Sequence, residues 1–300
     1  MSEKNKRTIQ DLKELFPKLQ IYNKGLVENF LETVMIIRDG EYEVFGQKRP
    51  IDIHPPLKRS KKWTVMFESL PRLFPHLCPG LPDPKIYVEN IDTFEKAAEF
   101  GTEGACLNMA SDWVPGGGVL KGSKAQEEDL CRRSTLAWSL FRYGSSAHRE
   151  LLKIKREGFQ KYPIPTYGCI WSPCIAIIKD RQGNLLREMV ETNVISASAI
   201  RKPKLDSCGA MSIEDQGIVA EKMRSVLRCA AIKGIRKLIL GAWGCGAYHN
   251  PPETIAILFD CVLKEPEFKG WFSEICFAIL DDHNSPRGGN YSVFKNIIEK

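Results

Sequence analysis

The chain has 300 residues, of which 43% are hydrophobic and 27% charged, and a formal net charge of +6 at pH 7. This length suits one large globular domain, or one domain with a small accessory, and no stretch approaches the ~18 apolar residues of a membrane helix. The first residues are charged and amphipathic and lack the apolar core of a signal peptide. We therefore expect a soluble protein of the cytoplasm or nucleus, without a membrane partner.

Ten cysteines and five histidines are scattered along the chain, with no C-x-x-C pair. Most of the cysteines lie in apolar runs, which predicts buried, reduced thiols. Because a structural metal needs clustered ligands, we expect no metal and no cofactor. One dense basic run, residues 58–62, is too short to form a nucleic-acid surface by itself. It is typical of a solvated loop, with a nuclear-import signal as the alternative.

The first third of the chain has its own pattern. Residues 8–39 carry apolar side chains at helical spacing, and a hairpin-like segment follows at 41–46. A proline-rich, basic segment at 55–84 is typical of a linker or lid. We therefore predict a small, mainly helical accessory region with its linker at 1–84 and the main domain at 85–300.

From residue 86 onward, short β-prone runs alternate with helical patterns, as a sheet covered by helices on both faces requires. This predicts an α/β domain, whose ligands lie beyond the carboxyl ends of the strands. Two glycine-rich turns fall at such ends. The expected strands are 86–88, 105–110, 168–171, 175–178, 194–197, 237–241 and 274–280, and the expected helices are 93–100, 126–141, 214–233 and 253–263.

The first glycine-rich turn follows the strand predicted at 105–110. Gly116, Gly117 and Gly118 stand together, followed by Val119. Without Cβ atoms, three such residues let backbone N–H groups turn toward one point, which makes an anion cradle or merely a loop. It is not a Walker A motif, because no Gly-Lys-Ser/Thr follows at the required spacing.

An acidic helix start follows the last of these glycines after seven intervening residues, at Gln126, Glu127 and Glu128. Acids in a first helical turn have a structural explanation, since each complements the helix dipole by roughly 0.3 to 1 kcal/mol. Their position nevertheless places carboxylates one short loop from a bound phosphate and its sugar. Successive helical residues point ~100° apart, so the two glutamates would have different roles. Hydrolysis of a glycosidic bond needs a carboxylic acid for the leaving oxygen and a carboxylate for water or the sugar cation.

The second glycine-rich turn follows the strand predicted at 237–241 and leads into a helix. Its residues are Gly244, Cys245, Gly246, Ala247 and Tyr248. Their N–H groups can receive phosphate oxygens, and a tight strand-to-helix connection is the alternative. Cys245 has no histidine suitably paired with it in the sequence, so we do not expect a nucleophile there.

The spacing of Gly116-Gly117-Gly118, seven residues and Gln126-Glu127-Glu128 resembles the signature of poly(ADP-ribose) glycohydrolases, which are catalytic macrodomains. The run from 115 to 134 is similar to the microbial type of that family. Segments at 37–42, 170–173, 179–186, 194–197 and 277–281 extend the likeness over nearly the entire chain. Two departures are residues 111–113, which are bulkier and more acidic than expected, and Tyr248, where bacterial members would carry phenylalanine.

The resemblance implies a macrodomain-like mixed sheet between helices and a glycosidase that hydrolyses ribose–ribose bonds of poly(ADP-ribose). It would release ADP-ribose and reverse protein ADP-ribosylation, as in the DNA damage response. Glu128 would be the catalytic acid and base, and Glu127 would orient ribose hydroxyls. The implied ligand-binding residues are Asn108, Gly116, Gly117, Gly118, Val119, Gln126, Gly244, Cys245, Gly246, Ala247 and Tyr248.

The implied partners are poly(ADP-ribose) or ADP-ribosylated proteins as substrate, with the protein acting as a monomer and without sequence-specific nucleic-acid binding. Three alternatives remain open. One is a hydrolase that removes a single ADP-ribose from a protein side chain, and another is a reader that binds ADP-ribose without cutting it. The third is a nucleotide-binding α/β scaffold with unrelated chemistry. Asn108 has an alternative role as well, since its side chain could satisfy backbone groups of the turn. Whether cleavage is exo or internal also stays open.

Overall fold

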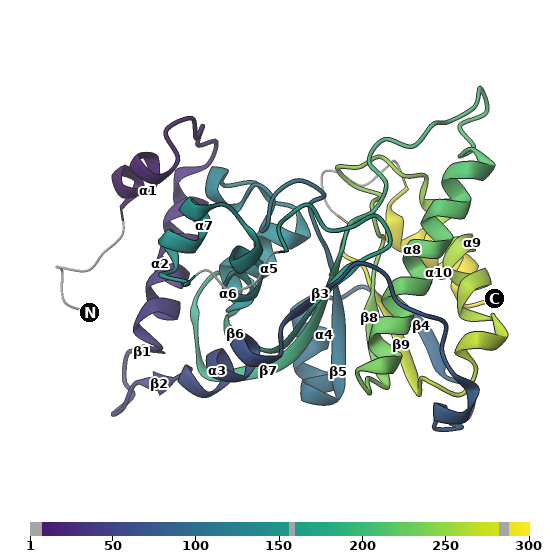
Figure 1. Ribbon diagram of the computed structural model, residues 1–300, viewed down its shortest axis with the longest axis horizontal. Coiled ribbons are helices and arrows are strands. Elements are labelled where there is room, and N and C mark those ends of the chain that lie inside the picture. Colours follow the sequence, from purple (N-terminus) through teal and green to yellow (C-terminus); the bar gives the residue numbers. More distant parts are fainter. Residues whose placement is uncertain (1–7, 156–159, 282–287) are drawn as a thin grey trace. The chain divides into compact units, whose positions relative to one another are not determined.

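The computed structural model describes residues 8–155, 160–281 and 288–300 (Figure 1). The chain divides into two compact units that interleave along the sequence. Unit 1 comprises Met1–Val65, Ala110–Pro163 and Ser172–Val194, and unit 2 comprises Met66–Met109, Ile164–Trp171 and Ile195–Lys300. The two units are defined by how compactly their residues pack, and they do not test the domain boundary predicted between residues 84 and 85. That boundary stays a prediction.

Unit 1 is built mainly of helices, together with a small two-stranded sheet and most of two long strands. The region 8–39, predicted to be helical, forms two helices separated by residues 16–23. The hairpin-like segment contributes β1, which pairs antiparallel with β2. The elements are α1 (Ile9–Leu15), α2 (Lys24–Asp39), β1 (Glu41–Tyr42), β2 (Ile51–Asp52), α3 (His54–Trp63), α5 (Gln126–Arg133), α6 (Leu136–Leu140) and α7 (Ser146–Leu151), with the 3₁₀ turns η4 (Val119–Lys121) and η5 (Phe141–Tyr143).

Helix α2 packs against α5, the helix with the acidic start. Its first turn is capped by the Asn23 side chain, and it ends at Gly40 in the left-handed conformation that favours glycine. The hydroxyl of Thr33 donates a hydrogen bond to the carbonyl oxygen of Arg132, the seventh residue of α5. These contacts place an N-terminal helix directly behind the acidic helix.

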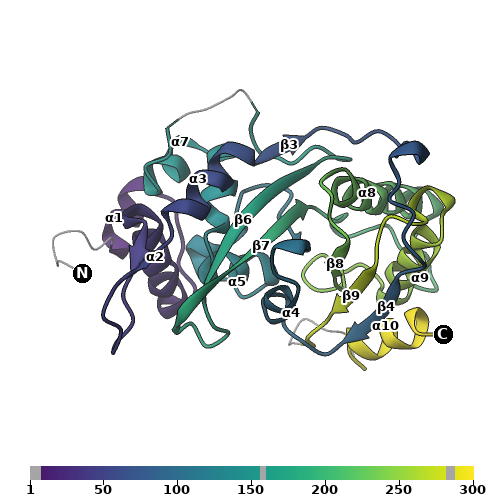
Figure 2. The ribbon, with the colours of Figure 1, turned by 90° about the horizontal axis from the view of Figure 1, so that it is seen from below.

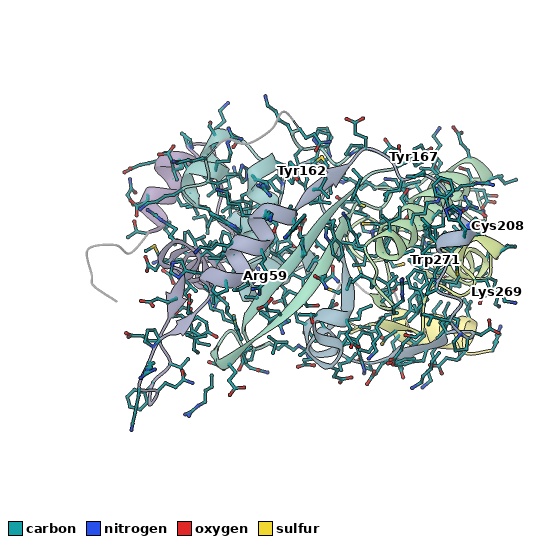
Figure 3. All side chains as sticks on the ribbon, turned by 60° about the horizontal axis from the view of Figure 1, so that its bottom comes forward. Arg59, Tyr162, Tyr167, Cys208, Lys269 and Trp271 are labelled. Atoms are coloured by element: carbon teal, nitrogen blue, oxygen red, sulfur yellow. The ribbon has the colours of Figure 1, made fainter. Side chains whose placement is uncertain are left out.

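The basic run at 58–62 was expected to be a solvated loop, and this expectation is wrong because it lies on α3. A proline in the first turn suits the start of a helix, since the N–H that proline lacks has no partner there anyway. The buried Ser60 faces inward, whereas Arg59, labelled in Figure 3, donates to the Glu191 carboxylate at 2.6 Å. The helix therefore has a packed inner face and a cationic outer face.

Unit 2 is an α/β body whose central strands are parallel. Strand β8 lies between β5 and β9, and β9 also pairs with β4. The side chains of β8 and β9 are largely buried, as parallel strands with both faces covered require. The elements are β4 (Lys85–Glu89), α4 (Thr93–Phe100), β5 (Gly104–Met109), α8 (Ile213–Ile232), β8 (Lys237–Leu240), α9 (Pro252–Leu263), β9 (Glu274–Ala278) and α10 (Asn290–Ile298), with the 3₁₀ turns η2 (Pro75–Leu77), η3 (Gly101–Glu103) and η6 (Pro266–Phe268).

Seven strands form one mixed sheet in the order β3-β6-β7-β5-β8-β9-β4, where β3 is Val65–Phe67, β6 is Cys169–Lys179 and β7 is Leu185–Ala197. Figure 2 shows β6 and β7 as the two long arrows of the sheet. The predicted α/β class with a mixed sheet flanked by helices is confirmed. Among the described residues, no helix combines the length and the apolar character that crossing a membrane requires.

One predicted helix is interrupted. The sequence suggests a single helix over 126–141, whereas α5 ends at Arg133 and α6 begins at Leu136. Ser134 between them is extended, and the N–H of Thr135 donates to the carbonyl oxygen of Ala176 in β6. Hydrogen bonding to the strand therefore ends the acidic helix after eight residues.

Candidate active site

The three acids at the start of α5 separate into two groups. Asp129 forms an ion pair with Arg133, with 2.7 Å between Oδ2 and Nη1. Glu127 and Glu128 turn instead toward the glycine run and are only 3% and 7% exposed. The two glutamates were predicted to point in different directions, and they do accept hydrogen bonds from different backbone N–H groups of the segment 111–118.

The Glu127 carboxylate ties together the two ends of a short loop. Its Oε2 accepts a hydrogen bond from the N–H of Ser111 at 2.7 Å, and its Oε1 accepts one from the N–H of Gly116 at 3.1 Å. Both oxygens are therefore engaged by the backbone. Because hydrogen bonds to an ionised carboxylate are stronger than neutral ones, this residue fixes the geometry of the loop that precedes the glycine run.

The Glu128 carboxyl is held at one oxygen only. Oε1 accepts a hydrogen bond from the N–H of Gly118 at 2.6 Å, whereas Oε2 is buried and has no hydrogen-bond partner among the described residues. Burial raises the pKa of Glu128, and the Gly118 hydrogen bond and the charge of Arg132 oppose this only in part. A carboxyl group in this state retains its proton to higher pH, as a general acid must.

The glycines are needed because the carboxylates pack directly on them. Gly117 has φ +55°, and a Cβ there would collide with Glu128 Oε1 and come within 3.0 Å of Glu127 Oε2. A Cβ on Gly118 would collide with the hydroxyl of Ser123. A side chain at either position would therefore displace the acids or the loop that leads to them.

The N–H groups of this run are already used inside the loop. Those of Gly116 and Gly118 donate to the two glutamates, and those of Gly117 and Val119 donate to the carbonyl oxygens of Val114 and Gly116. The first glycine-rich turn thus binds the protein's own carboxylates. Its part in binding an anion stays a prediction, as do the ligand roles of Val119 and of the half-buried Gln126.

The second glycine-rich turn, in unit 2, differs from the first. Gly244 has φ +78°, and among the described residues the N–H groups of Gly244, Gly246 and Ala247 make no hydrogen bond. Asn250 supports the turn, because its side-chain amide donates hydrogen bonds to the carbonyl oxygens of Ile200 and Gly244 at 2.7 and 3.0 Å. Its available N–H groups suit it to receive an oxyanion.

Two side chains of the second turn have different surroundings. Cys245 is 4% exposed, and burial raises its pKa, so a reactive thiolate is not favoured there. Tyr248 is half-exposed, and the guanidinium of Arg201 lies 5.6 Å from the centre of its ring. The N–H of Lys202 donates to the carbonyl oxygen of Tyr248 at 2.9 Å.

Asn108 lies near the end of β5, in unit 2, and is fully buried. Its side-chain amide donates to the hydroxyl of Ser196 at 3.0 Å. A structural role for this side chain is thus evident, and its predicted contact with ribose stays a prediction. The structure therefore groups the glycine run with Gln126, Glu127 and Glu128 in unit 1, and groups Asn108 with the second turn in unit 2.

Sequence reasoning missed residues that hold or flank these turns. Asn250 supports the second turn, and Arg201 adds an exposed cation beside Tyr248. The available signal for Arg201 was its place four residues after the strand predicted at 194–197, beyond the carboxyl end where ligands of α/β sheets bind. In the described part of the chain, no group of three or more histidine, cysteine, aspartate or glutamate side chains could hold a metal ion.

Taken together, an α/β fold and a buried carboxyl pair held by a glycine run are the features expected of a macrodomain-like hydrolase of glycosidic bonds. Comparisons with known proteins agree. The family model for the microbial-type PARG (poly(ADP-ribose) glycohydrolase) catalytic domain matches residues 31–180. A comparison with curated protein sequences gives no significant match.

Solved structures of bacterial enzymes are similar over most of their length. The poly(ADP-ribose) glycohydrolase from Thermomonospora curvata, bound to the inhibitor ADP-HPD, is 26% identical, with a TM-score of 0.72 over 91% of this chain and 99% of that one. The enzyme from Deinococcus radiodurans in complex with ADP-ribose is 30% identical, with a TM-score of 0.62 over 82% of this chain and 97% of that one. The chain belongs to the microbial-type poly(ADP-ribose) glycohydrolase family, and the predicted family and macrodomain-like fold are confirmed.

Proposed function

We propose that this chain is a glycosidase that hydrolyses the ribose–ribose O-glycosidic bonds of poly(ADP-ribose) and releases ADP-ribose. Membership of the family supports this hydrolysis, and the state of the Glu128 carboxyl group supports the proposed acid–base mechanism. Glu128 is a buried carboxyl with a raised pKa, one oxygen anchored on Gly118 and the other without a hydrogen-bond partner among the described residues. Such a group can give a proton to a departing oxygen and then accept one.

In the proposed reaction Glu128 both donates the proton and recovers one, so no second acid or base is needed. Protonated Glu128 donates its proton to the oxygen of the departing ribose as the bond from that oxygen to the anomeric carbon breaks. The resulting carboxylate takes a proton from the attacking water, whose oxygen joins the anomeric carbon and completes ADP-ribose. General acid–base catalysis of this kind contributes typically ~10²- to ~10⁴-fold.

Glu127 is proposed to act through position. Because its two oxygens hold Ser111 and Gly116, it keeps the loop beside Glu128 in one conformation, and a carboxylate still has lone pairs left for ribose hydroxyls. For ligand binding we propose chiefly the predicted residues of the second turn, Gly244 to Tyr248, because the N–H groups of Gly116 to Val119 are engaged within the first turn. In that set, the available N–H groups of Gly244, Gly246 and Ala247 support contacts with the diphosphate.

The decisive experiment replaces Glu128 with glutamine, which keeps the shape of the side chain and removes its titratable proton. Purified protein given labelled polymer in the presence of a chelator should release ADP-ribose, and Glu128→Gln should abolish release while ADP-ribose still binds by calorimetry. Asp129→Asn is the matched control, since Asp129 pairs with Arg133 and should leave turnover largely intact. Unchanged turnover in Glu128→Gln would refute the proposal.

The same assay separates the alternatives. Faster release from serine- or glutamate-linked ADP-ribose than from polymer would indicate a mono-ADP-ribosyl hydrolase, and binding without any release would indicate a reader. We further propose that the protein acts as a monomer in the cytoplasm or nucleus, which gel filtration and cell fractionation test directly.

A further inference from the structure

A large apolar side chain stands exposed beside the acidic pair. Trp113 is 69% exposed, and it lies in the loop 111–116 that the Glu127 carboxylate holds at both ends. A single exposed apolar side chain on a protein surface is ordinary and needs no explanation. Here, however, the backbone that carries the indole is fixed by one of the candidate active-site carboxylates.

Hydrogen bonds within the loop add to this restraint. The hydroxyl of Ser111 accepts hydrogen bonds from the N–H groups of Trp113 and Val114, at 3.2 and 3.4 Å. The carbonyl oxygen of Val114 in turn accepts one from the N–H of Gly117 at 3.2 Å. The loop therefore presents its indole from a backbone that is ordered before any ligand arrives, which lowers the entropy cost of binding.

The position of the indole limits what it can reach. Trp113 is two residues from Ser111, whose N–H lies 2.7 Å from the Glu127 carboxylate, and two residues span at most about 7 Å. The substrate carries two adenines near the bond that is cut. The one on the retained unit is separated from the bond by a diphosphate, whereas the one on the departing unit is attached to the same ribose as the departing oxygen. Only the second adenine lies within a few ångströms of the acid pair.

We propose that Trp113 stacks on the adenine of the departing ADP-ribose unit and so forms a binding subsite for a purine on the leaving-group side. The proposal rests on the proposed function. A planar indole matches the flat face of a purine, and stacking of this kind supports single-stranded nucleotide binding. The neighbouring Asp112 carries a carboxylate, which disfavours a phosphate as the occupant.

The test compares two substrates that share the bond to be cut. One is the dimer of ADP-ribose, and the other is an analogue in which the departing ribose carries a methyl group in place of adenine. Trp113→Ala should lower kcat/KM on the dimer by between about 5-fold and about 150-fold, the range of one base-stacking contact, mainly through KM. On the analogue it should change nothing, and Trp113→Phe should retain most of the preference for the dimer.

Trp63 offers a matched control. It is 57% exposed and lies at the end of α3 in the same unit, so Trp63→Ala removes an equally large exposed indole away from the loop. It should leave both substrates unaffected. An equal loss on both substrates in Trp113→Ala would show that the indole only supports the loop, and no loss on either would show that it is idle. Both outcomes overturn the proposal.

Fluorescence gives a readout that does not depend on turnover. In the Glu128→Gln background, the dimer should quench the emission of Trp113, the analogue should not, and the quenching should vanish in the double variant that also carries Trp113→Phe. Cleavage of neither substrate by the unaltered protein would overturn the proposed function, and the quenching measurement would still decide the role of Trp113. Equal quenching by dimer and analogue, or none by either, would refute the stacking.

Discussion

The two glycine-rich turns look alike in sequence and differ in what their N–H groups bind. In the first, Gly116 and Gly118 donate to the carboxylates of Glu127 and Glu128. In the second, the N–H groups of Gly244 and Gly246 have no acceptor among the described residues. The same property of glycine, a backbone without a Cβ, thus serves to hold two buried carboxylates in one turn and to leave donors available in the other.

This difference shows why glycine content alone does not identify a phosphate site. An anion cradle needs N–H groups that converge and remain unpaired. A turn whose N–H groups are already paired with the protein's own carboxylates can hold those carboxylates in place, but it has few N–H groups left for a ligand. We therefore expect changes in the first turn to affect kcat and changes in the second to affect ligand affinity.

After Glu128→Gln, which should abolish release of ADP-ribose, the next largest effect is expected when Glu127 becomes glutamine. The change replaces one acceptor oxygen by an amide N–H₂, so either the N–H of Ser111 or that of Gly116 then faces a donor. Leaving a buried donor unpaired costs roughly 1–3 kcal/mol of stability. The displaced loop should also lower kcat by ~100-fold, because misplacing a reacting group by ~1 Å has about this cost. Turnover of polymer and urea unfolding measure the two effects.

Asp129→Asn is again the control, because it alters an acid in the same helical turn that faces the arginines instead of the loop. A Glu127→Gln variant with kcat within about threefold of the parent would break the comparison, because the first turn would then hold its shape without that carboxylate.

A matched pair of glycine changes sharpens the comparison further. Gly117→Ala and Gly244→Ala each place a Cβ on a residue with positive φ, +55° and +78°, so each costs about 1–2 kcal/mol in backbone strain. Gly117→Ala should lower kcat roughly tenfold, because its Cβ displaces the acids, and should leave ADP-ribose affinity within twofold. Gly244→Ala should do the reverse, because its Cβ meets Asn250, which supports the turn.

Steady-state kinetics and calorimetry on the two variants decide the matter, with thermal unfolding to confirm that both remain folded. If Gly117→Ala weakened ADP-ribose binding while kcat stayed the same, the first turn would be an anion site after all.

The smallest effect concerns stability and pH at Glu128. Burial raises its folded-state pKa above the value in the unfolded chain, so between the two values the folded state binds more protons and stability falls as pH rises. Glu128→Gln removes this pH-dependent loss of stability, because glutamine does not titrate. The variant should therefore be more stable than the parent at pH 8, by about 1.4 kcal/mol for each unit of raised pKa, and this advantage should disappear below pH 4. Urea unfolding at several pH values measures it, and a constant difference across the range would contradict it.

Much of the fold was predictable from local pattern. Strands 86–88, 105–110, 237–241 and 274–280 agree with β4, β5, β8 and β9 to within two residues at either end. For β5, β8 and β9 the reason is that buried parallel strands are largely apolar runs, whereas β4 is half-exposed and was recognised from its β-prone residues. The strands predicted at 168–171 and 175–178 are a single strand, β6, in which Pro173 and the positive φ of Cys174 imitate a turn. The outer part of β7 was missed, because residues 185–191 mix apolar and charged side chains without a regular pattern and are half-exposed or exposed.

The site was only partly predictable. The glycine spacing and the acidic helix start correctly placed Glu127 and Glu128 beside the glycine run, since both are local features of the sequence, and the catalytic roles of the two residues stay a prediction. The direction of the Glu128 pKa shift depends on burial and could not be read from the sequence. Nor could the pairing of Ser111 with Glu127, which joins backbone and side chain across sixteen residues. The break after Arg133 depends on a hydrogen bond to a distant strand and was missed for the same reason.

The shortness of α5 has a mechanical consequence. With eight residues it is about 12 Å long, and its far end is joined to β6 through Thr135. A tilt of a few degrees about that joint would move the carboxylates of Glu127 and Glu128 by less than about 1 Å. The same tilt of a helix twice as long would move them about twice as far. Early termination of the helix thus limits how far bending about this joint can move Glu127 and Glu128.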